Sequence, residues 1–187
     1  MTYLTQGIVL RRDNLSDNDR RYVIYTSGFG KINATIKGAK KITSKLNAHL
    51  DYFFVSTLML AKGKSFERIA SARIEQRFLS IASNIFKSSA AFYFCEAIDA
   101  LIKYSLSDQK IFLILLSFFG QLEESKNKNE IVINLNKSIY QLLKCLGYQP
   151  LITARSQKQL FIDFNKLIQE TAEKEIKSYQ YLAKILA

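Results

Sequence analysis

The sequence predicts an α+β protein in which a β-rich region comes first and an all-helical region follows. Alternating apolar and polar residues, together with turn residues, concentrate in the first half of the 187-residue chain, whereas apolar residues recur at helical spacing from about Ser80 onwards. The charge is divided in the same way, since residues 1–80 carry 14 basic and 6 acidic side chains and residues 81–187 carry 13 and 10. We therefore expect two domains, one over residues 1–79 and one over residues 80–187.

The first domain is expected to contain five strands and one short helix. Lys31–Lys37 shows the clearest alternation, with Ile32, Ala34 and Ile36 on one face and polar residues on the other. In chain order the predicted elements are strands at about Gly7–Arg12, Arg21–Thr26 and Lys31–Lys37, a helix at Thr43–Leu50, and strands at Tyr52–Leu60 and Phe66–Gln76. This count fits a small closed β-barrel of the OB type, because closure removes exposed strand edges.

The second domain is expected to be all-helical. Ile131, Leu135, Ile139 and Leu142 recur at three- and four-residue spacing, which is the pattern of a helix packed on a core. The predicted helices are Ile81–Lys103, Gln109–Glu124, Glu130–Leu146 and about Gln157–Ala187.

The composition favours a protein that binds polyanions and holds no metal. The formal net charge is +11 and the pI about 9.6, which favours nucleic acid or acidic protein segments as partners. Cys95, Cys145 and His49 are too few for a structural zinc site, which takes four N or S ligands, and we expect no cofactor. The sequence shows neither a secretory signal nor an apolar run long enough to span a bilayer. We expect a soluble cytoplasmic protein with no membrane partner.

Basic residues of the first domain are expected to gather into one DNA-binding patch. Four lysines surround Gly38 near the end of a predicted strand, and antiparallel pairing would bring arginines of neighbouring strands beside them. The expected DNA contacts are Arg11, Arg12, Arg20, Arg21, Lys31, Lys37, Lys40, Lys41 and Lys45. Tyr22 and Tyr25 are candidates for stacking on single-stranded bases. Because the two tyrosines have opposite strand parity, only one of them can face a ligand.

No combination of residues in the sequence points to an enzyme. Gly63-Lys64-Ser65 ends like a phosphate-binding P-loop, but Leu58 stands where that motif needs its first glycine. We find no carboxylate cluster and no acid/base pair of the kind that phosphodiester cleavage uses. The sequence therefore favours a non-enzymatic DNA-binding protein. The alternative is a basic interaction adaptor that holds acidic protein tails and contacts DNA only weakly.

Several motifs resemble the bacterial recombination mediator family RecO. They are Gly-Ile-Val-Leu-Arg-Arg at 7–12, Leu-Ser-Asp-Asn-Asp-Arg at 15–20, Tyr-Thr-Ser-Gly-Phe-Gly-Lys at 25–31, Lys-Gly-Ala-Lys-Lys at 37–41 with Ser44 and Leu46, and Leu-Gly-Tyr-Gln-Pro at 146–150. The resemblance is specific through residue 76 and thinner over the helices. Many members follow the last motif with a four-cysteine zinc module, whereas residues 151–157 contain no cysteine and the chain is short for the family.

The resemblance implies an N-terminal OB-fold domain that binds single- and double-stranded DNA and a helical domain that recruits proteins. It implies annealing of complementary strands and help in loading RecA onto DNA coated with single-strand-binding protein in recombinational repair. The implied partners are DNA, the acidic C-terminal tail of the single-strand-binding protein, RecR and, indirectly, RecA, all at the nucleoid of a bacterial cytoplasm. By position, Arg11, Arg12, Lys37, Lys40 and Lys41 would form the DNA-contacting set. Phe118 and Phe119 are candidates for a groove that holds the acidic tail, although core packing is the ordinary interpretation of both.

Overall fold

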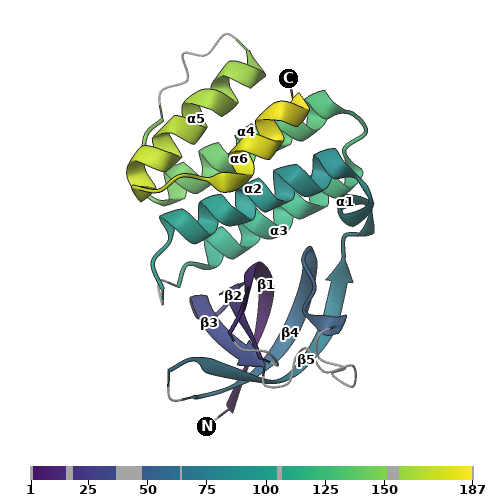
Figure 1. Cartoon of the computed structure of the whole chain (residues 1–187), viewed down its shortest axis with the longest axis vertical. Helices are drawn as coiled ribbons and strands as arrows, with labels where there is room; N and C mark the ends of the chain where they lie inside the picture. The colour runs from purple at the N-terminus through teal and green to yellow at the C-terminus, as the bar shows by residue number, and fades with distance from the viewer. Residues whose placement is uncertain are drawn as a thin grey trace. The chain divides into compact units, whose positions relative to one another are not determined.

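The chain forms two compact units in a computed structural model that describes residues 2–15, 19–36, 48–63, 65–104, 107–150 and 156–186 (Figure 1). The first unit consists of Met1–Arg77 and Ile102–Phe112, and the second of Phe78–Leu101 and Leu113–Ala187. Strands build the first unit and helices the second, so the predicted α+β class, with strands before helices, is confirmed.

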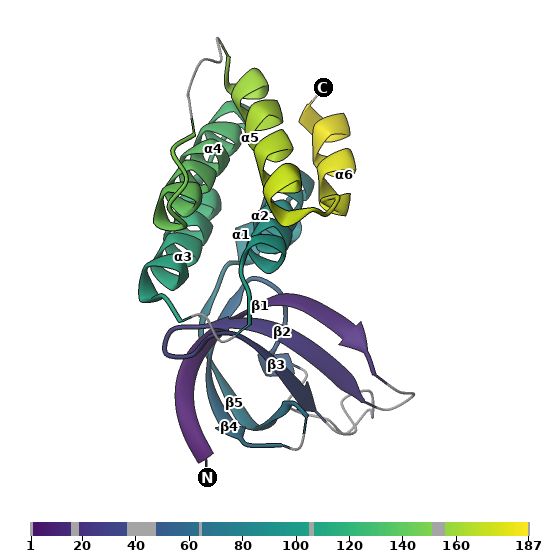
Figure 2. The ribbon, with the colours of Figure 1, turned by 90° about the vertical axis from the view of Figure 1, so that its left-hand side faces the viewer.

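Five strands close into a barrel in the first unit. They are β1 (Thr2–Asn14), β2 (Arg20–Thr26), β3 (Gly30–Ile36), β4 (Phe54–Ala61) and β5 (Glu67–Arg77). The order round the barrel is β1-β2-β3-β5-β4, and every pair is antiparallel except β3 with β5. Figure 2 shows β1 bending round the barrel, which lets its first half pair with β4 and its second half with β2. This five-stranded closed sheet is the OB-like barrel that the strand count predicts.

The barrel interior is apolar and tightly packed. Ile32, Ala34 and Ile36 of β3 belong to the core, as the alternation of this strand predicts. Gly7 marks the closest approach, because a Cβ at this position would lie 2.7 Å from Ile24 Cγ2 and 2.9 Å from Leu58 Cδ1. Only glycine therefore allows β1, β2 and β4 to meet at this point without displacing their neighbours.

Residues 102–112 belong to the barrel unit although they follow a long helix in the chain. The Tyr25 hydroxyl donates to the Asp108 carbonyl at 3.0 Å, and the Ser107 hydroxyl donates to the Gly28 carbonyl at 3.0 Å. The helical domain predicted over residues 80–187 includes this segment. Its attachment to β2 depends on tertiary contacts between residues about eighty positions apart, which local patterns do not reveal.

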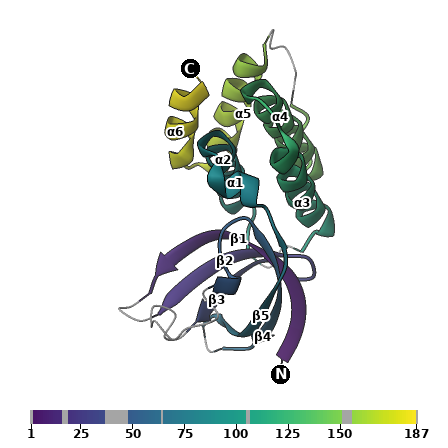
Figure 3. The ribbon, with the colours of Figure 1, turned by 90° about the vertical axis from the view of Figure 1, so that its right-hand side faces the viewer.

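Helices build the second unit, and Figure 3 shows α2 beside α6. They are α1 (Leu79–Ser83), α2 (Ile85–Leu101), α3 (Gln109–Glu124), α4 (Lys128–Cys145), α5 (Gln157–Ala172) and α6 (Lys177–Leu186). α2 packs against α1, α4, α5 and α6. Within the described ranges, none of these helices has both the length and the apolar character that a bilayer crossing requires.

Two of the predicted helices are each divided into two. Asn84 has extended backbone angles between α1 and α2, and its side-chain oxygen accepts the Phe86 and Lys87 backbone N–H groups, which begins α2. Glu173 adopts a left-handed conformation (φ 49°, ψ 35°) that ends α5. Neither break contains a glycine or proline, the residues that usually mark the end of a helix in a sequence. The sequence pattern therefore gave no sign of the two breaks.

The helical core is built from aromatic rings and one buried polar bond. The rings of Phe94 and Phe118 lie 4.7 Å apart between centroids, and those of Tyr93 and Phe161 lie 4.9 Å apart. The Tyr93 hydroxyl donates to Asn165 Oδ1 at 3.1 Å, which satisfies both buried groups and joins α2 to α5.

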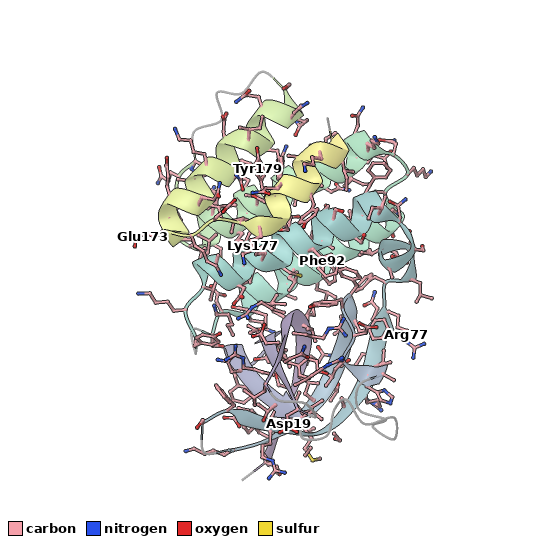
Figure 4. The ribbon with its side chains drawn as sticks, in the orientation of Figure 1. Asp19, Arg77, Phe92, Glu173, Lys177 and Tyr179 are labelled. Carbon is pink, nitrogen blue, oxygen red and sulfur yellow. The ribbon has the colours of Figure 1, made fainter. Side chains whose placement is uncertain are left out.

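The last helix is held by a carboxylate from α2. Glu96 accepts hydrogen bonds from the backbone N–H groups of Lys177 and Ser178 at 3.0 and 2.9 Å, at the start of α6. Figure 4 labels Lys177 and Tyr179 in this first turn of the helix. A carboxylate at a helix N-terminus satisfies otherwise unpaired N–H groups and complements the helix dipole. This contact fixes the start of α6 against α2.

Candidate nucleic-acid interface

A row of polar side chains crosses four strands on the outside of the barrel. The register pairs Asp13 of β1 with Arg21 of β2, Arg21 with Thr35 of β3, and Thr35 with Arg68 of β5. Directly paired residues project from the same face of a sheet. The β2–β3 face is the surface through which many OB-folds bind oligonucleotides, so this row is the first candidate for a nucleic-acid interface.

Two grooves flank the turn between β4 and β5, next to this row. The first groove has a volume of about 580 Å³ and includes Leu15, Thr35 and Arg68 in its lining. The second, of about 340 Å³, includes Lys31, Asn33, Glu67 and Tyr104. Both grooves share Lys62, Gly63, Ser65 and Phe66 of the turn. The β4–β5 turn and the end of β1 are again the regions that OB-folds use for oligonucleotides.

The Asp13 carboxylate binds two of the predicted DNA-contacting arginines. Arg21 donates to Asp13 Oδ2 from Nη2 at 2.7 Å and from Nε at 3.1 Å, and Arg11 forms an ion pair with the same oxygen. Burial raises the pKa of Asp13, but the hydrogen bonds and charges of the two arginines outweigh it and hold this pKa below its usual value. The Arg21 guanidinium also lies 5.7 Å from the Phe66 ring centroid, which connects this cluster to both grooves.

The other two predicted arginines also have partners within the barrel unit. Arg12 donates to Asp51 Oδ1 at 3.0 Å, and its guanidinium carbon lies 4.0 Å from the centroid of the Tyr52 ring. Arg20 is hydrogen-bonded to the Tyr22 hydroxyl. The arginines of β1 and β2 therefore lie close together, as predicted, but acidic side chains already offset part of their charge.

Three predicted contacts must be corrected because their side chains are buried. Tyr22 packs in the barrel core, and the Tyr25 hydroxyl donates to the Asp108 carbonyl. Both tyrosines are 0% exposed and offer no face to a base. Lys31 is only 4% exposed, and its Nζ lies 4.5 Å from the centroid of the Tyr104 ring. Lys31 still borders the second groove, but it does not present its charge on an open surface.

The remaining predicted DNA contacts lie outside the described residues. They are Lys37, Lys40, Lys41 and Lys45. Most of the helix predicted at residues 43–50 also lies outside the described residues. Their assignment remains a prediction from the sequence.

Sequence reasoning missed the residues that line the grooves. Lys62 and Arg68 are exposed and Phe66 is half-buried at the turn between β4 and β5, while Tyr104 is 47% exposed on the segment after α2. In the sequence, residues 63–65 of this turn show only a resemblance to the end of a P-loop. The turn's proximity to β3 follows from the parallel pairing of β3 with β5, which brings Thr35 opposite Arg68. The OB strand order itself could have identified this turn.

The helical unit contradicts the predicted partner contacts and offers a different groove. Phe118 and Phe119 are both 0% exposed and pack in the core, so neither can hold a peptide. A groove of about 200 Å³ lies between α4 and α5, with Ile133, Lys137 and Tyr140 in its lining. Its apolar floor and lysine rim are the features expected of a site for an apolar, acidic peptide end.

Among the residues that the structure describes, the cysteines and acidic side chains form no metal-binding cluster. Burial raises the pKa of the Cys95 thiol to about 12. In the part of the chain that the structure describes, no three His, Cys, Asp or Glu side chains converge as metal ligands do. The described interface consists of cationic, hydroxyl and aromatic groups around two open grooves, which can bind phosphate and stack on bases.

The chain is similar to proteins of one known family. Residues 1–78 match the family model described as "Recombination protein O N terminal". DNA repair protein RecO of Dehalococcoides mccartyi strain 195 is 31% identical over 148 residues, which cover 79% of this chain and 57% of the relative. DNA repair protein RecO of Roseiflexus sp. is 30% identical over 148 residues, covering 79% and 51%.

A third relative matches over a longer stretch of the chain. DNA repair protein RecO of Nostoc punctiforme is 28% identical over 171 residues, covering 88% of this chain and 57% of the relative. The chain thus spans about half the length of the curated relatives that it matches.

Proposed function

We propose that this chain, which belongs to the RecO family, acts in DNA repair and recombination as a non-enzymatic mediator whose barrel binds DNA at the two grooves. The observation that carries the proposal is the position of Lys62, Phe66 and Arg68 at these grooves, beside the Asp13–Arg21 row. Exposed cations neutralise phosphates, and an adjacent aromatic ring gives a base a surface on which to stack. The proposed ligands are single- and double-stranded DNA.

Strand annealing follows from the same surface. Two complementary strands repel each other through their phosphates, and a cationic protein surface lowers that repulsion. In the proposed role, the protein anneals complementary strands and helps to load RecA onto DNA coated with single-strand-binding protein, with RecR as a further partner. Both activities should weaken as salt increases.

The groove between α4 and α5 is the proposed site for the acidic tail of the single-strand-binding protein. Lys137 at its edge would bind acidic side chains, while Ile133 and Tyr140 would contact an apolar terminal residue. This assignment replaces Phe118 and Phe119, whose burial excludes them.

The DNA-binding proposal is tested by removing two groove cations together. Lys62→Ala/Arg68→Ala should lose two phosphate contacts, which lowers the slope of log affinity against log salt by about 1.4 for single-stranded DNA. The control is Lys166→Ala/Lys174→Ala, which removes the same charge from exposed positions of the helical unit. The measurement is fluorescence anisotropy of a labelled oligonucleotide across a salt series, with circular dichroism to check the fold. An equal loss of DNA affinity in both variants would mean that the net charge of the protein determines DNA binding and that the grooves do not.

One observation favours a second function, that of a basic adaptor for acidic proteins. Asp13 and Asp51 already bind three arginines, which reduces the charge available to DNA phosphates. Titration with single-stranded DNA and with an acidic peptide separates the two functions. The mediator should bind both ligands, whereas the adaptor should bind the peptide tightly and DNA weakly.

A further inference from the structure

The Phe66 ring lies at the boundary between the two grooves. Phe66 is half-buried and contributes to the lining of both. The Arg21 guanidinium carbon lies 5.7 Å from the centroid of this ring, so a cation accompanies it. Leu15, 49% exposed, adds apolar surface to the first groove, and Tyr104, 47% exposed, adds a ring to the second. The grooves therefore combine apolar and aromatic surface with cations.

The position of the ring in a groove limits which form of DNA can reach it. A base stacks on an aromatic side chain with its flat face, and in a single strand that face can be uncovered. A duplex keeps its bases stacked on one another and paired at their edges, so it presents no free base face inside a groove. The exposed cations Lys62 and Arg68, in contrast, can bind phosphates of either form. The cations therefore contribute to binding of both forms, and the ring contributes to binding of single strands alone.

We propose that Phe66 makes the barrel distinguish single-stranded from duplex DNA, by stacking on one unpaired base in a groove. This role rests on the proposed DNA-binding function and deepens it, because it names the form of DNA that the grooves select. It also has a consequence for annealing. A base must leave the ring when it pairs with the complementary strand, so the annealed product lacks a contact that the single strand had. The protein therefore releases the duplex more readily than the strands from which it forms.

The test measures the affinity of the full chain for a labelled single strand and for a duplex of the same length with G·C pairs at its ends, at one salt concentration. Phe66→Leu keeps an apolar side chain but removes the ring. It should bind the single strand about fivefold more weakly, the lower end of what stacking on one aromatic side chain contributes, and the duplex equally well. Phe66→Tyr keeps an aromatic ring and should keep the natural ratio of the two affinities.

The matched control is Phe29→Leu. It makes the same chemical change at a ring that is 41% exposed on the β2–β3 turn and that lines neither groove. Both affinities of this variant should equal those of the natural sequence. In an annealing assay, excess unlabelled duplex should inhibit Phe66→Leu more strongly than the natural sequence, because the duplex competes better when the single strand has lost its stacking contact.

The outcomes separate the role of Phe66 from the DNA-binding function. An equal loss of affinity for both forms of DNA in Phe66→Leu, or no loss for either, overturns this role and leaves DNA binding intact. Failure of the natural sequence to bind either form overturns the DNA-binding function itself. Ultraviolet cross-linking of the natural sequence needs no substitution: the single strand should cross-link to the tryptic peptide 65–68, which contains Phe66, and the duplex should not. Equal cross-linking of both forms to this peptide would also overturn the role of Phe66.

Discussion

Asp13 is expected to restrain DNA binding, because it holds two arginines that would otherwise bind phosphate. Its Oδ2 atom is paired with both Arg11 and Arg21, and Arg21 lies beside Phe66 at the grooves. Asp13→Asn removes the negative charge at this point and changes the side-chain volume very little. The variant should bind single-stranded DNA more tightly than the natural sequence.

The magnitude follows from counting charges. The substitution adds one net positive charge, which is enough to neutralise about one more phosphate. Each such phosphate contact steepens the slope of log affinity against log salt by about 0.7 for single-stranded DNA. The affinity advantage of the variant should therefore grow about fivefold for each tenfold dilution of salt. The fold should survive, because half-exposed ion pairs contribute only about 0–1 kcal/mol each to stability.

The assay is fluorescence anisotropy of a labelled oligonucleotide at several salt concentrations. Glu75→Gln is the matched control: Glu75 Oε1 accepts from Arg73 Nη2 at 2.9 Å and from the Thr57 hydroxyl at 2.7 Å, on the β4–β5 part of the barrel. Its loss also adds one positive charge. If Asp13→Asn and Glu75→Gln gain the same affinity for DNA, the change in net charge explains the effect and the position of Asp13 does not matter. If Asp13→Asn binds DNA more weakly, Asp13 orients its arginines for binding, and the reasoning above is refuted.

Further predictions concern stability. The pKa of Asp13 is lowered in the folded state, so the ionised carboxylate stabilises the fold at neutral pH and this stabilisation is lost as the pH falls below about 4. The difference in free energy of unfolding between the natural sequence and Asp13→Asn, measured by urea denaturation, should therefore shrink over that pH range. Tyr25→Phe removes the hydrogen bond from the Tyr25 hydroxyl to the Asp108 carbonyl, which still accepts from the Ile111 backbone N–H, and should lower the free energy of unfolding by about 1 kcal/mol, measured in the same way. Glu173→Gly relieves a left-handed backbone and should raise the free energy of unfolding by about 1 kcal/mol; a decrease would show that the Glu173 side chain stabilises the turn. Phe118→Ala should lower the free energy of unfolding by about 3–5 kcal/mol, and a loss of acidic-peptide binding without this destabilisation would contradict its place in the core.

The sequence predicted the fold well where local patterns determine it. The alternation in β3 separates the core residues from Asn33 and Thr35, and the stripe in α4 places Ile131, Leu135 and Ile139 in the helical core. These features depend only on the side-chain period of strands and helices. The barrel closure followed from the number and order of strands.

The candidate site was predicted less well, because tertiary contacts decide it. Tyr25 has the outward parity that stacking requires, but it is fully buried and its hydroxyl donates to the carbonyl of Asp108, 83 residues later in the chain. Phe66 and Arg68 reach the interface through the parallel pairing of β3 and β5, which no local pattern shows. Arg11 and Arg21, on neighbouring strands, share Asp13 as a partner, and the contact between Asp13 and Arg21 could be assigned only from the strand register.

The most direct test of the account is ultraviolet cross-linking of a single-stranded oligonucleotide to the protein, followed by mass spectrometry of the tryptic peptides. The grooves lie around Phe66 and Tyr104, which fall in the tryptic peptides 65–68 and 104–110. We predict that these two peptides carry the dominant cross-links and that Lys62→Ala/Arg68→Ala reduces the cross-links at both sites. In this variant the first site is followed in peptide 65–73, because Arg68→Ala removes a tryptic cleavage site. Cross-links confined to residues 113–187 would show that DNA binds the helical unit and would contradict the assignment of the grooves.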